Sequence, residues 1–205
     1  MQGSTVTRSP STPRLRLTAA WYCALLMFAG LNAPTSLVED ADTLRRVTAL
    51  LLVVSAALGR IWCSVFIAGL KDQHLVTAGP YSVCRHPLYA LSLLAGLGLG
   101  MASRSMLVTA ATLALLMLLF GRAVRAEETL LAALHGAAYR TYRERTPRFW
   151  PQWENYVVPE SIVIAPRVLW KSFLDAGSIV VLLALIEIAI DLHDRGLLPS
   201  WWSVP

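Results

Sequence analysis

Long apolar runs dominate this sequence and leave few folds open to it. A helix needs about 20 mostly apolar residues to cross a bilayer, and five stretches approach that length. Backbone polar groups inside lipid must be hydrogen-bonded within the protein, which favours helices. We therefore predict an all-α, polytopic membrane protein with about five transmembrane helices, over residues 17–38, 47–70, 88–103, 105–121 and 173–190.

The composition agrees with a membrane protein. Of the 205 residues, 56% are hydrophobic and only 15% are charged, which is too apolar for an ordinary soluble domain of this length. The third and fourth runs are separated only by the polar residues Ser103, Arg104 and Ser105. This spacing predicts a helical hairpin.

The first apolar run follows three arginines, as a signal peptide would. The only small-residue cleavage candidate, "LNAP", would place a proline directly after the cut. We therefore interpret 17–38 as a retained span. Residues 1–16 are expected to be a disordered cytoplasmic tail, because the first 13 are rich in Ser, Thr and Pro, and 17–205 a single membrane domain.

The positive charges predict the orientation. Thirteen of the 18 Lys and Arg residues lie in the N-terminal tail, in 71–87 and in 122–171. With five spans these three segments fall on one side, which the positive-inside rule makes cytoplasmic. The net charge of +5 is explained by attraction to anionic lipid headgroups, so no nucleic-acid partner is expected. The three cysteines show no C-x-x-C spacing, and no metal site is indicated.

The stretch "GPYSVCRHPLYA", residues 79–90, concentrates polar and rigid groups between two spans. Pro87 fixes its own φ and biases His86 away from helical geometry. Non-helical backbone beside lipid needs polar partners, which a bound polar ligand can supply. An interfacial connector, with Arg85 on lipid phosphates, explains the same residues equally well.

A second polar segment begins as the helix pattern "RAEETLLAALHGAAYRTYRER". At 100° per residue, Glu127 shares a face with Leu130, Leu134 and Tyr142. If Glu127 and Glu128 begin this helix, the helix dipole explains Glu128. It does not explain a carboxylate on the apolar face, so Glu127 is the candidate functional residue.

Together, these two segments resemble the isoprenylcysteine carboxyl methyltransferase family and its phospholipid-methyltransferase relatives. The shared pattern is G-x-Y-x-x-x-R-H-P-x-Y, then E-E-x-x-L and G-x-x-Y-x-x-Y, over about residues 60–151. The resemblance implies that S-adenosylmethionine binds on the cytoplasmic side, under a helical lid segment after the fourth span. The implied cofactor contacts are Gln73, His74, Leu75, Val76, Tyr81, Arg85, His86, Pro87, Leu88, Tyr89 and Glu127.

The resemblance also implies a lipidic or prenylated acceptor that arrives from the membrane lipids. Carboxyl O-methylation of a prenyl-cysteine-like compound leads, and N-methylation of an amino phospholipid is the alternative. An arginine that holds a carboxylate acceptor would suffice without a general base, because a carboxylate is already ionised at neutral pH. The candidates are Arg122, Arg125 and Arg148, with Arg85 as a further possibility.

Two other classes stay open at this point. Membrane sterol reductases that use NADPH end in a similar R-H-P-x-Y element, and a non-catalytic membrane protein could use the same loops to contact headgroups. The sequence fixes neither the oligomeric state nor the roles of three charged residues placed in or near spans, Arg60, Glu187 and Asp191.

Overall fold

The computed structural model describes residues 39–67, 74–162, 164 and 166–197, together with Ala20, Trp21 and Ala24. Throughout this described part the regular structure is helical, with no strand, which confirms the all-α prediction. The elements are α2 (Glu39–Ile67), α3 (Pro80–Val83), α4 (Pro87–Ala102), α5 (Met106–Arg145), η1 (Trp153–Asn155) and α6 (Pro166–Asp194).

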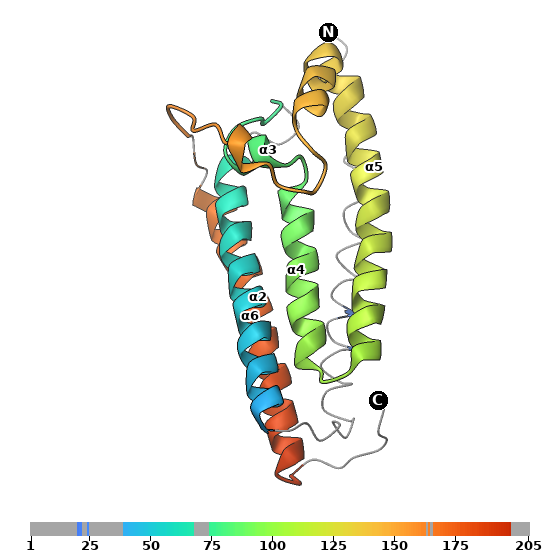
Figure 1. Ribbon diagram of the computed structural model, residues 1–205. Coiled ribbons are helices and arrows are strands. Elements are labelled where there is room, and N and C mark those ends of the chain that lie inside the picture. The colour runs from blue at the N-terminus through green and yellow to red at the C-terminus, as the bar shows by residue number, and fades with distance from the viewer. Residues whose placement is uncertain are drawn as a thin grey trace.

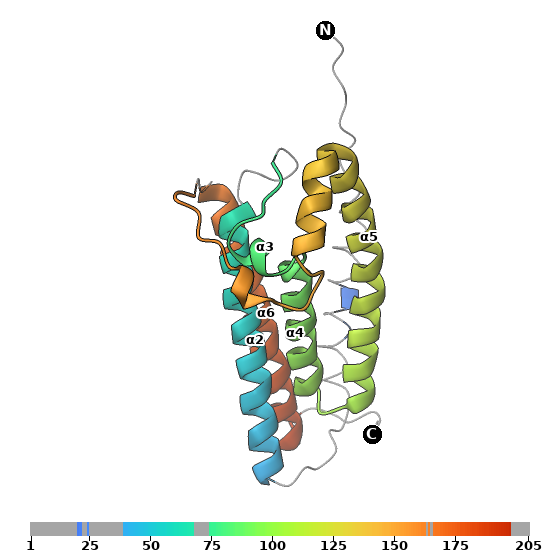
Figure 2. The same cartoon turned by 45° about the horizontal axis from the view of Figure 1, so that its top comes forward.

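The helices α2, α4 and α6 pack side by side, and α5 lies along the other side of α4 (Figures 1 and 2). Their shared core consists of small and branched apolar side chains, among them Ala49, Val53, Ala95 and Ile186. A Cβ on Gly98 would lie 2.8 Å from Val53 Cγ2 and 2.9 Å from the Ala49 carbonyl oxygen. Glycine at this position therefore lets α4 approach α2 closely.

Three described helices are long and apolar enough to cross a membrane, over Asp40–Ile67, Met106–Arg145 and Pro166–Asp194. They overlap the predicted spans 47–70 and 105–121 and contain the predicted span 173–190; residues 68–70 lie outside the described residues. The predicted span 88–103 corresponds to α4, whose 16 residues rise about 24 Å. The predicted span 17–38 lies outside the described residues, apart from Ala20, Trp21 and Ala24. The chain is an integral membrane protein.

Helix α5 differs from its prediction. It runs without interruption from the apolar hairpin into the segment expected to be a separate helix, and it turns back at Gly136 (Figure 1). Gly136 has φ 51° and ψ −116°, a conformation that only glycine adopts without strain. This turn resets the helical phase, so Tyr142, which follows the turn, does not continue the face of Glu127. Leu130 and Leu134 on that face are 42% and 52% exposed.

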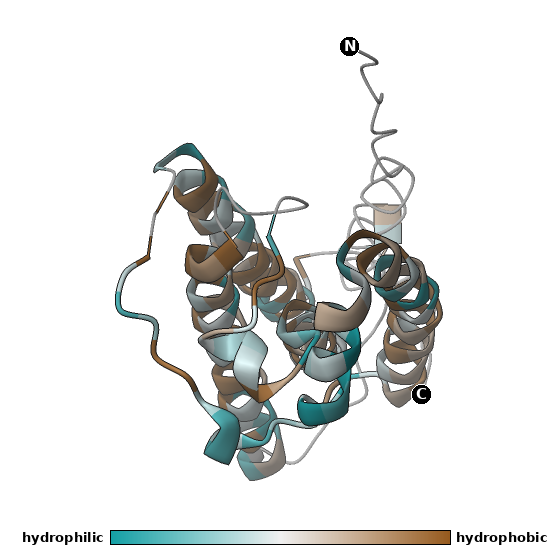
Figure 3. Cartoon of the chain, turned by 90° about the horizontal axis from the view of Figure 1, so that it is seen from above, coloured by the Kyte–Doolittle hydropathy of each residue, from teal (hydrophilic) through white to brown (hydrophobic). Residues whose placement is uncertain are grey.

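Polar and charged residues gather at the two ends of the bundle. The segments around α3 and η1 and the returning part of α5 gather at one end, here called the motif end (Figure 1). Seen from above that end, hydrophilic stretches lie over mainly hydrophobic helices (Figure 3). The turn between α4 and α5 lies at the opposite, far end.

An ion-pair network closes the far end and gives Glu187 a partner. Arg45 Nη1 donates hydrogen bonds to the carbonyl oxygens of Met101 and Ala102, each at 3.1 Å, and lies 3.1 Å from Glu187 Oε1. It thereby satisfies the last carbonyls of α4, which have no intrahelical partner. Arg104 pairs with Asp42 and Asp194 at 2.8 Å. In contrast, Asp191 pairs with its helical neighbour Arg195 and with no other side chain among the described residues.

Candidate functional site

Backbone hydrogen bonds hold the two motif segments together at the motif end. The amide of Gly79 donates to the carbonyl oxygen of Val157 at 2.8 Å, and the amide of Arg85 donates to that of Pro147 at 2.8 Å. The amide of His86 donates to the Arg148 carbonyl oxygen at 3.1 Å. The non-helical backbone around Pro87 thus finds its polar partners in the segment that follows α5.

A buried carboxylate, Glu128 of α5, lies at the centre of this junction. Its Oε1 lies 2.9 Å from Arg85 Nη1, 3.1 Å from His86 Nε2 and 3.1 Å from Arg148 Nε. Its Oε2 accepts a second hydrogen bond from Arg148 Nη2. We call Glu128, Arg85, His86 and Arg148 the Glu128 cluster. It ties α5 to both motif segments.

The expectation that Glu127 and Glu128 begin a helix is wrong. Helix α5 begins at Met106, because the apolar hairpin and the polar helix are continuous. Glu128 therefore cannot be explained by a helix dipole, whose effect falls off within the first turn. Glu127 is partly exposed, and its Oε2 accepts a hydrogen bond from the Tyr89 hydroxyl at 3.1 Å. Both glutamates contact the segment 79–90.

Sequence reasoning missed Glu128, although a signal for it existed. The segment 79–90 carries an arginine and a histidine, and a buried arginine requires a carboxylate partner. Glu127 and Glu128 are adjacent carboxylates on the adjoining strongly patterned segment, which also carries Glu144. Periodicity alone favoured Glu127, because it assumed one unbroken helix across Gly136.

The Glu128 cluster carries a net positive charge. Burial lowers the pKa of His86, and this effect outweighs the hydrogen bond to the Glu128 carboxylate, which raises that pKa. The imidazole is therefore neutral at neutral pH. A carboxylate that contacts two guanidinium groups is ionised. Two arginine cations and one carboxylate leave a charge of +1. In addition, Arg85 Nε is buried and has no hydrogen-bond partner among the described residues.

Aromatic rings surround this cluster. His86 lies 5.8 Å from the Tyr89 ring and 6.0 Å from the Phe149 ring, measured between centroids. Tyr89 in turn lies 5.2 Å from the ring of Phe120 on α5. These rings offer π faces to a cationic ligand and shield the ion pairs from water.

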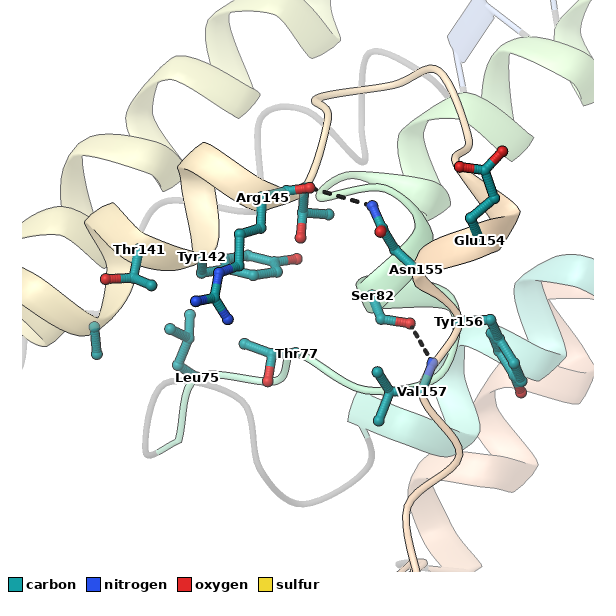
Figure 4. Close-up of a pocket in the computed structure, with 12 residues that line it drawn as sticks. Leu75, Thr77, Ser82, Thr141, Tyr142, Arg145, Glu154, Asn155, Tyr156 and Val157 are labelled. Carbon is teal, nitrogen blue, oxygen red and sulfur yellow. Dashed lines mark hydrogen bonds between the residues drawn. The ribbon is translucent and has the colours of Figure 1, made fainter.

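A cavity of about 670 Å³ opens at the motif end (Figure 4), and no member of the Glu128 cluster lines it. Its walls come from the segment before α3, from α3 itself, from the returning part of α5 and from the region of η1. The Tyr142 hydroxyl donates to the Tyr81 carbonyl oxygen at 2.7 Å and so joins two of these walls. The polar lining residues are Thr77, Ser82, Thr141, Tyr142, Arg145, Thr146, Glu154, Asn155 and Tyr156.

The predicted cofactor residues fall into separate groups. Leu75 lines the cavity, whereas Arg85, His86, Tyr89 and Glu127 lie in and beside the Glu128 cluster. Tyr81 is buried, and its hydroxyl has no hydrogen-bond partner in the described part of the chain. Val76 and Leu88 pack on a core of Cys63, Phe66 and Tyr81. His74 is exposed, and Pro87 is the first residue of α4. Gln73 lies outside the described residues.

The predicted acceptor-binding arginines also separate. Arg148 lies in the Glu128 cluster and is 43% exposed. Arg122 and Arg125 are exposed on α5, and their guanidinium groups make no hydrogen bond or ion pair with the described residues. Of the arginines proposed from sequence, the structure thus brings Arg85 and Arg148 together.

The buried His86 makes stability depend on pH. Its pKa is lower in the folded protein than the ordinary value of about 6.5, so the unfolded chain binds this proton more readily. The free energy of unfolding is therefore expected to fall as the pH drops through about 6.5. Thermal unfolding of the detergent-solubilised protein between pH 8 and pH 5 measures this. His86→Gln is expected to flatten the profile, whereas His74→Gln, at an exposed site, leaves it unchanged; equal slopes for both variants would contradict the assignment.

Comparison with known proteins matches the part of the chain that carries both motif segments. The structure defines a helical membrane protein whose two motif segments meet at one end of the bundle. The family model for isoprenylcysteine carboxyl methyltransferase (ICMT) matches residues 44–133, which include the whole segment 79–90 and both glutamates. This match supports the resemblance that the motifs carry.

Two relatives carry names that concern metal resistance. The cobalt-zinc-cadmium resistance protein CzcN of Cupriavidus metallidurans is 35% identical over 143 residues, which are 70% of this chain and 66% of that protein. The nickel-cobalt-cadmium resistance protein NccN of Alcaligenes xylosoxydans xylosoxydans is 38% identical over 100 residues, 49% of this chain and 46% of that protein. The chain thus spans about two thirds and under half of these relatives. No solved structure matches.

Proposed function

We propose that this protein is an S-adenosylmethionine-dependent methyltransferase that methylates an anionic group of a lipidic acceptor, in the first instance the carboxylate of a prenyl-cysteine-like compound. The observation that carries this proposal is the Glu128 cluster. It joins the two family motifs at the end of the bundle that also holds the cavity, and its net charge of +1 favours an anion over an ammonium group. The family match supports the reaction class.

The cavity and the adjoining motif residues fit the cofactor. A volume of about 670 Å³ lies within the usual range for small-molecule sites. Leu75 supplies an apolar wall, and hydroxyl, amide and carboxylate groups supply partners for a ribose and an amino acid moiety. Glu127 can accept from a hydroxyl or an ammonium group, and Tyr89 can flank the positive sulfur. When bound, the cofactor supplies an electrophilic methyl group on a sulfonium.

The chain's own residues then bind and orient the acceptor. Arg148 is the most accessible member of the Glu128 cluster, and we assign it to the acceptor's carboxylate. Glu128 keeps its guanidinium in position, and the spare donor on Arg85 can add a second contact. His86 is neutral and does not have to act as a base, because the attacking carboxylate oxygen is already ionised. In-line transfer chiefly requires alignment and exclusion of water.

The membrane supplies the route for such an acceptor. Apolar side chains such as Leu118 and Leu107 are exposed along α5 and face lipid once the helix spans the bilayer. The part of α5 that returns after Gly136 lies over the cavity, because Thr141, Tyr142 and Arg145 line it. We assign it the role of a lid. The basic segments at the motif end support a cytoplasmic location for this end.

Amine N-methylation is the alternative reaction in the same family of proteins, and the type of bond distinguishes the two. Membranes containing the protein are incubated with labelled S-adenosylmethionine and lipid extract. Carboxyl methylation yields label that mild base releases as methanol, at a rate almost independent of pH between 6.5 and 8. Base-stable label, formed at a rate that rises with pH, would contradict a carboxylate acceptor and support an amine.

The names of the two relatives suggest the setting in which this reaction matters. Among the described residues there is no group of three or more His, Cys, Asp or Glu side chains placed to hold a metal ion. We therefore propose that any contribution to metal resistance follows from methyl transfer at the membrane. A metal-sensitive host that expresses Arg148→Gln is then expected to lose the resistance that the wild type confers. Full resistance with this variant would separate resistance from catalysis.

A further inference from the structure

A second charged group crosses three helices at a distance from the Glu128 cluster. Arg60 of α2 donates through Nη1 to the Ser92 hydroxyl of α4 and through Nη2 to Asp175 Oδ2 of α6. The Ser92 hydroxyl in turn donates a hydrogen bond to the Leu88 carbonyl oxygen at 2.7 Å. Ionisable residues within a membrane span are costly, and they mark functional positions by default. Nothing in the proposed methyl transfer uses this group.

The Arg60–Asp175 pair lies near the polar boundary of the leaflet on the motif-end side. Trp170 and Lys171 are exposed near the beginning of α6, and such residues are typical of the membrane interface. Asp175 lies four and five residues further along, about 6–7.5 Å deeper. Arg60 precedes the end of α2 by seven residues, or about 10 Å. Lipid phosphates and glycerol groups lie at this level.

The ion pair is open rather than sealed. The side chain of Asp175 is 50% exposed, whereas that of Arg60 is 20% exposed. Arg60 Nε finds no hydrogen-bond acceptor among the described residues. A pair that served only to join α2 to α6 would be better protected, whereas the exposed side of this carboxylate can accept from a second cation.

Lys171 supplies a second cation on the same face. It lies four residues before Asp175, so the two side chains are neighbours on the surface of α6. Lys171 makes no ion pair or hydrogen bond in the part of the chain that the structure describes. The Lys171 ammonium thus lies near a half-exposed carboxylate and the partly exposed guanidinium that pairs with it.

We propose that Arg60, Lys171 and Asp175 bind the headgroup of a zwitterionic aminophospholipid such as phosphatidylethanolamine. The phosphate lies between Arg60 and Lys171, which provide donors for a charge-assisted pair. The primary ammonium lies on Asp175 and gives this carboxylate its second cation. The exposed Phe173 and Leu174 adjoin the acyl chains. This inference is independent of the proposed methyl transfer, since no methyl donor takes part.

Lipid titration without S-adenosylmethionine tests the proposal. Delipidated full-length protein in detergent is titrated with phosphatidylethanolamine, phosphatidylcholine and phosphatidylglycerol, and bound lipid is counted by native mass spectrometry. We expect phosphatidylethanolamine to bind about tenfold more tightly than the other two, since only its ammonium donates hydrogen bonds to a carboxylate. Equal or tighter binding of phosphatidylcholine or phosphatidylglycerol overturns the proposal.

Variants assign the contacts. Asp175→Asn is expected to remove the preference for phosphatidylethanolamine, whereas Lys171→Gln lowers the affinity for all three lipids and keeps the preference. The matched control is Asp191→Asn, because Asp191 is also on α6, half-exposed and paired with an arginine; it should change nothing. If Asp175→Asn does not fold, Lys171→Gln still decides, since it breaks no contact described here. Unchanged binding in Lys171→Gln contradicts the site.

Discussion

Glu128→Gln is expected to reduce methyl transfer at least about a hundredfold and to destabilise the folded protein. The substitution leaves two buried or partly buried guanidinium groups without their counter-charge, and breaking such a buried pair costs about 3–5 kcal/mol. It also frees Arg148, which then no longer holds the acceptor in line. Activity with labelled S-adenosylmethionine and thermal unfolding in the same detergent measure the two effects.

Glu127→Gln is the matched control on the neighbouring residue. Glu127 makes one hydrogen bond, to the Tyr89 hydroxyl, worth about 1 kcal/mol. We expect weaker cofactor binding with an almost unchanged melting temperature. In the double variant Glu128→Gln/Arg148→Gln, the removal of one cation should recover part of the lost stability. If Glu128→Gln has the melting temperature of the wild type and the double variant has a lower one, the Glu128 cluster is not the electrostatic unit described here.

Arg45→Met is expected to be the most damaging substitution at the far end, with a loss of about 3–5 kcal/mol. Arg45 is 9% exposed, and its removal leaves Glu187 with the longer 3.5 Å contact to Arg46 and takes one donor from each of the carbonyl oxygens of Met101 and Ala102. Loss of a charged partner is costly for buried groups, because their desolvation is then no longer offset. Because the network lies at the opposite end from the motifs, the refolded or surviving fraction should keep its affinity for the cofactor.

Arg195→Met provides the comparison. Arg195 pairs with Asp191 on the same helix, and its side chain is 67% exposed, so its loss should cost less than about 1 kcal/mol. Unfolding in mixed micelles with increasing denaturing detergent ranks the two variants. Equal stabilities would show that the far-end network does not hold α2, α4 and α6 together.

Local signals predicted much of the fold. Apolar length identified α2, the start of α5 and α6, while Pro87 and the polar turn at Ser103–Ser105 set the ends of α4. These features depend only on neighbouring residues and on the bilayer thickness. The reversal of α5 was missed, because a glycine inside a helical pattern does not reveal that it adopts a positive φ.

The candidate site was predicted in its parts and not in its geometry. The motifs identified His86, Tyr89 and a glutamate of the pair, since those residues recur at a fixed spacing. The choice of Glu128 over Glu127 as the buried residue depends on the rotation of α5 against α4. Likewise, the pairing of Arg60 with Asp175 joins residues 115 positions apart. Such contacts arise from tertiary packing, and a single sequence carries no local signal for them.

Cofactor binding tests the central claim most directly. The purified protein is titrated by calorimetry with S-adenosylmethionine, S-adenosylhomocysteine and NADPH, alongside Glu127→Gln and His86→Gln. The account predicts that both sulfur compounds bind with one site per chain, that NADPH does not, and that each substitution weakens binding about tenfold or more. Failure of both sulfur compounds to bind, or tight binding of NADPH, would contradict the proposed methyltransferase.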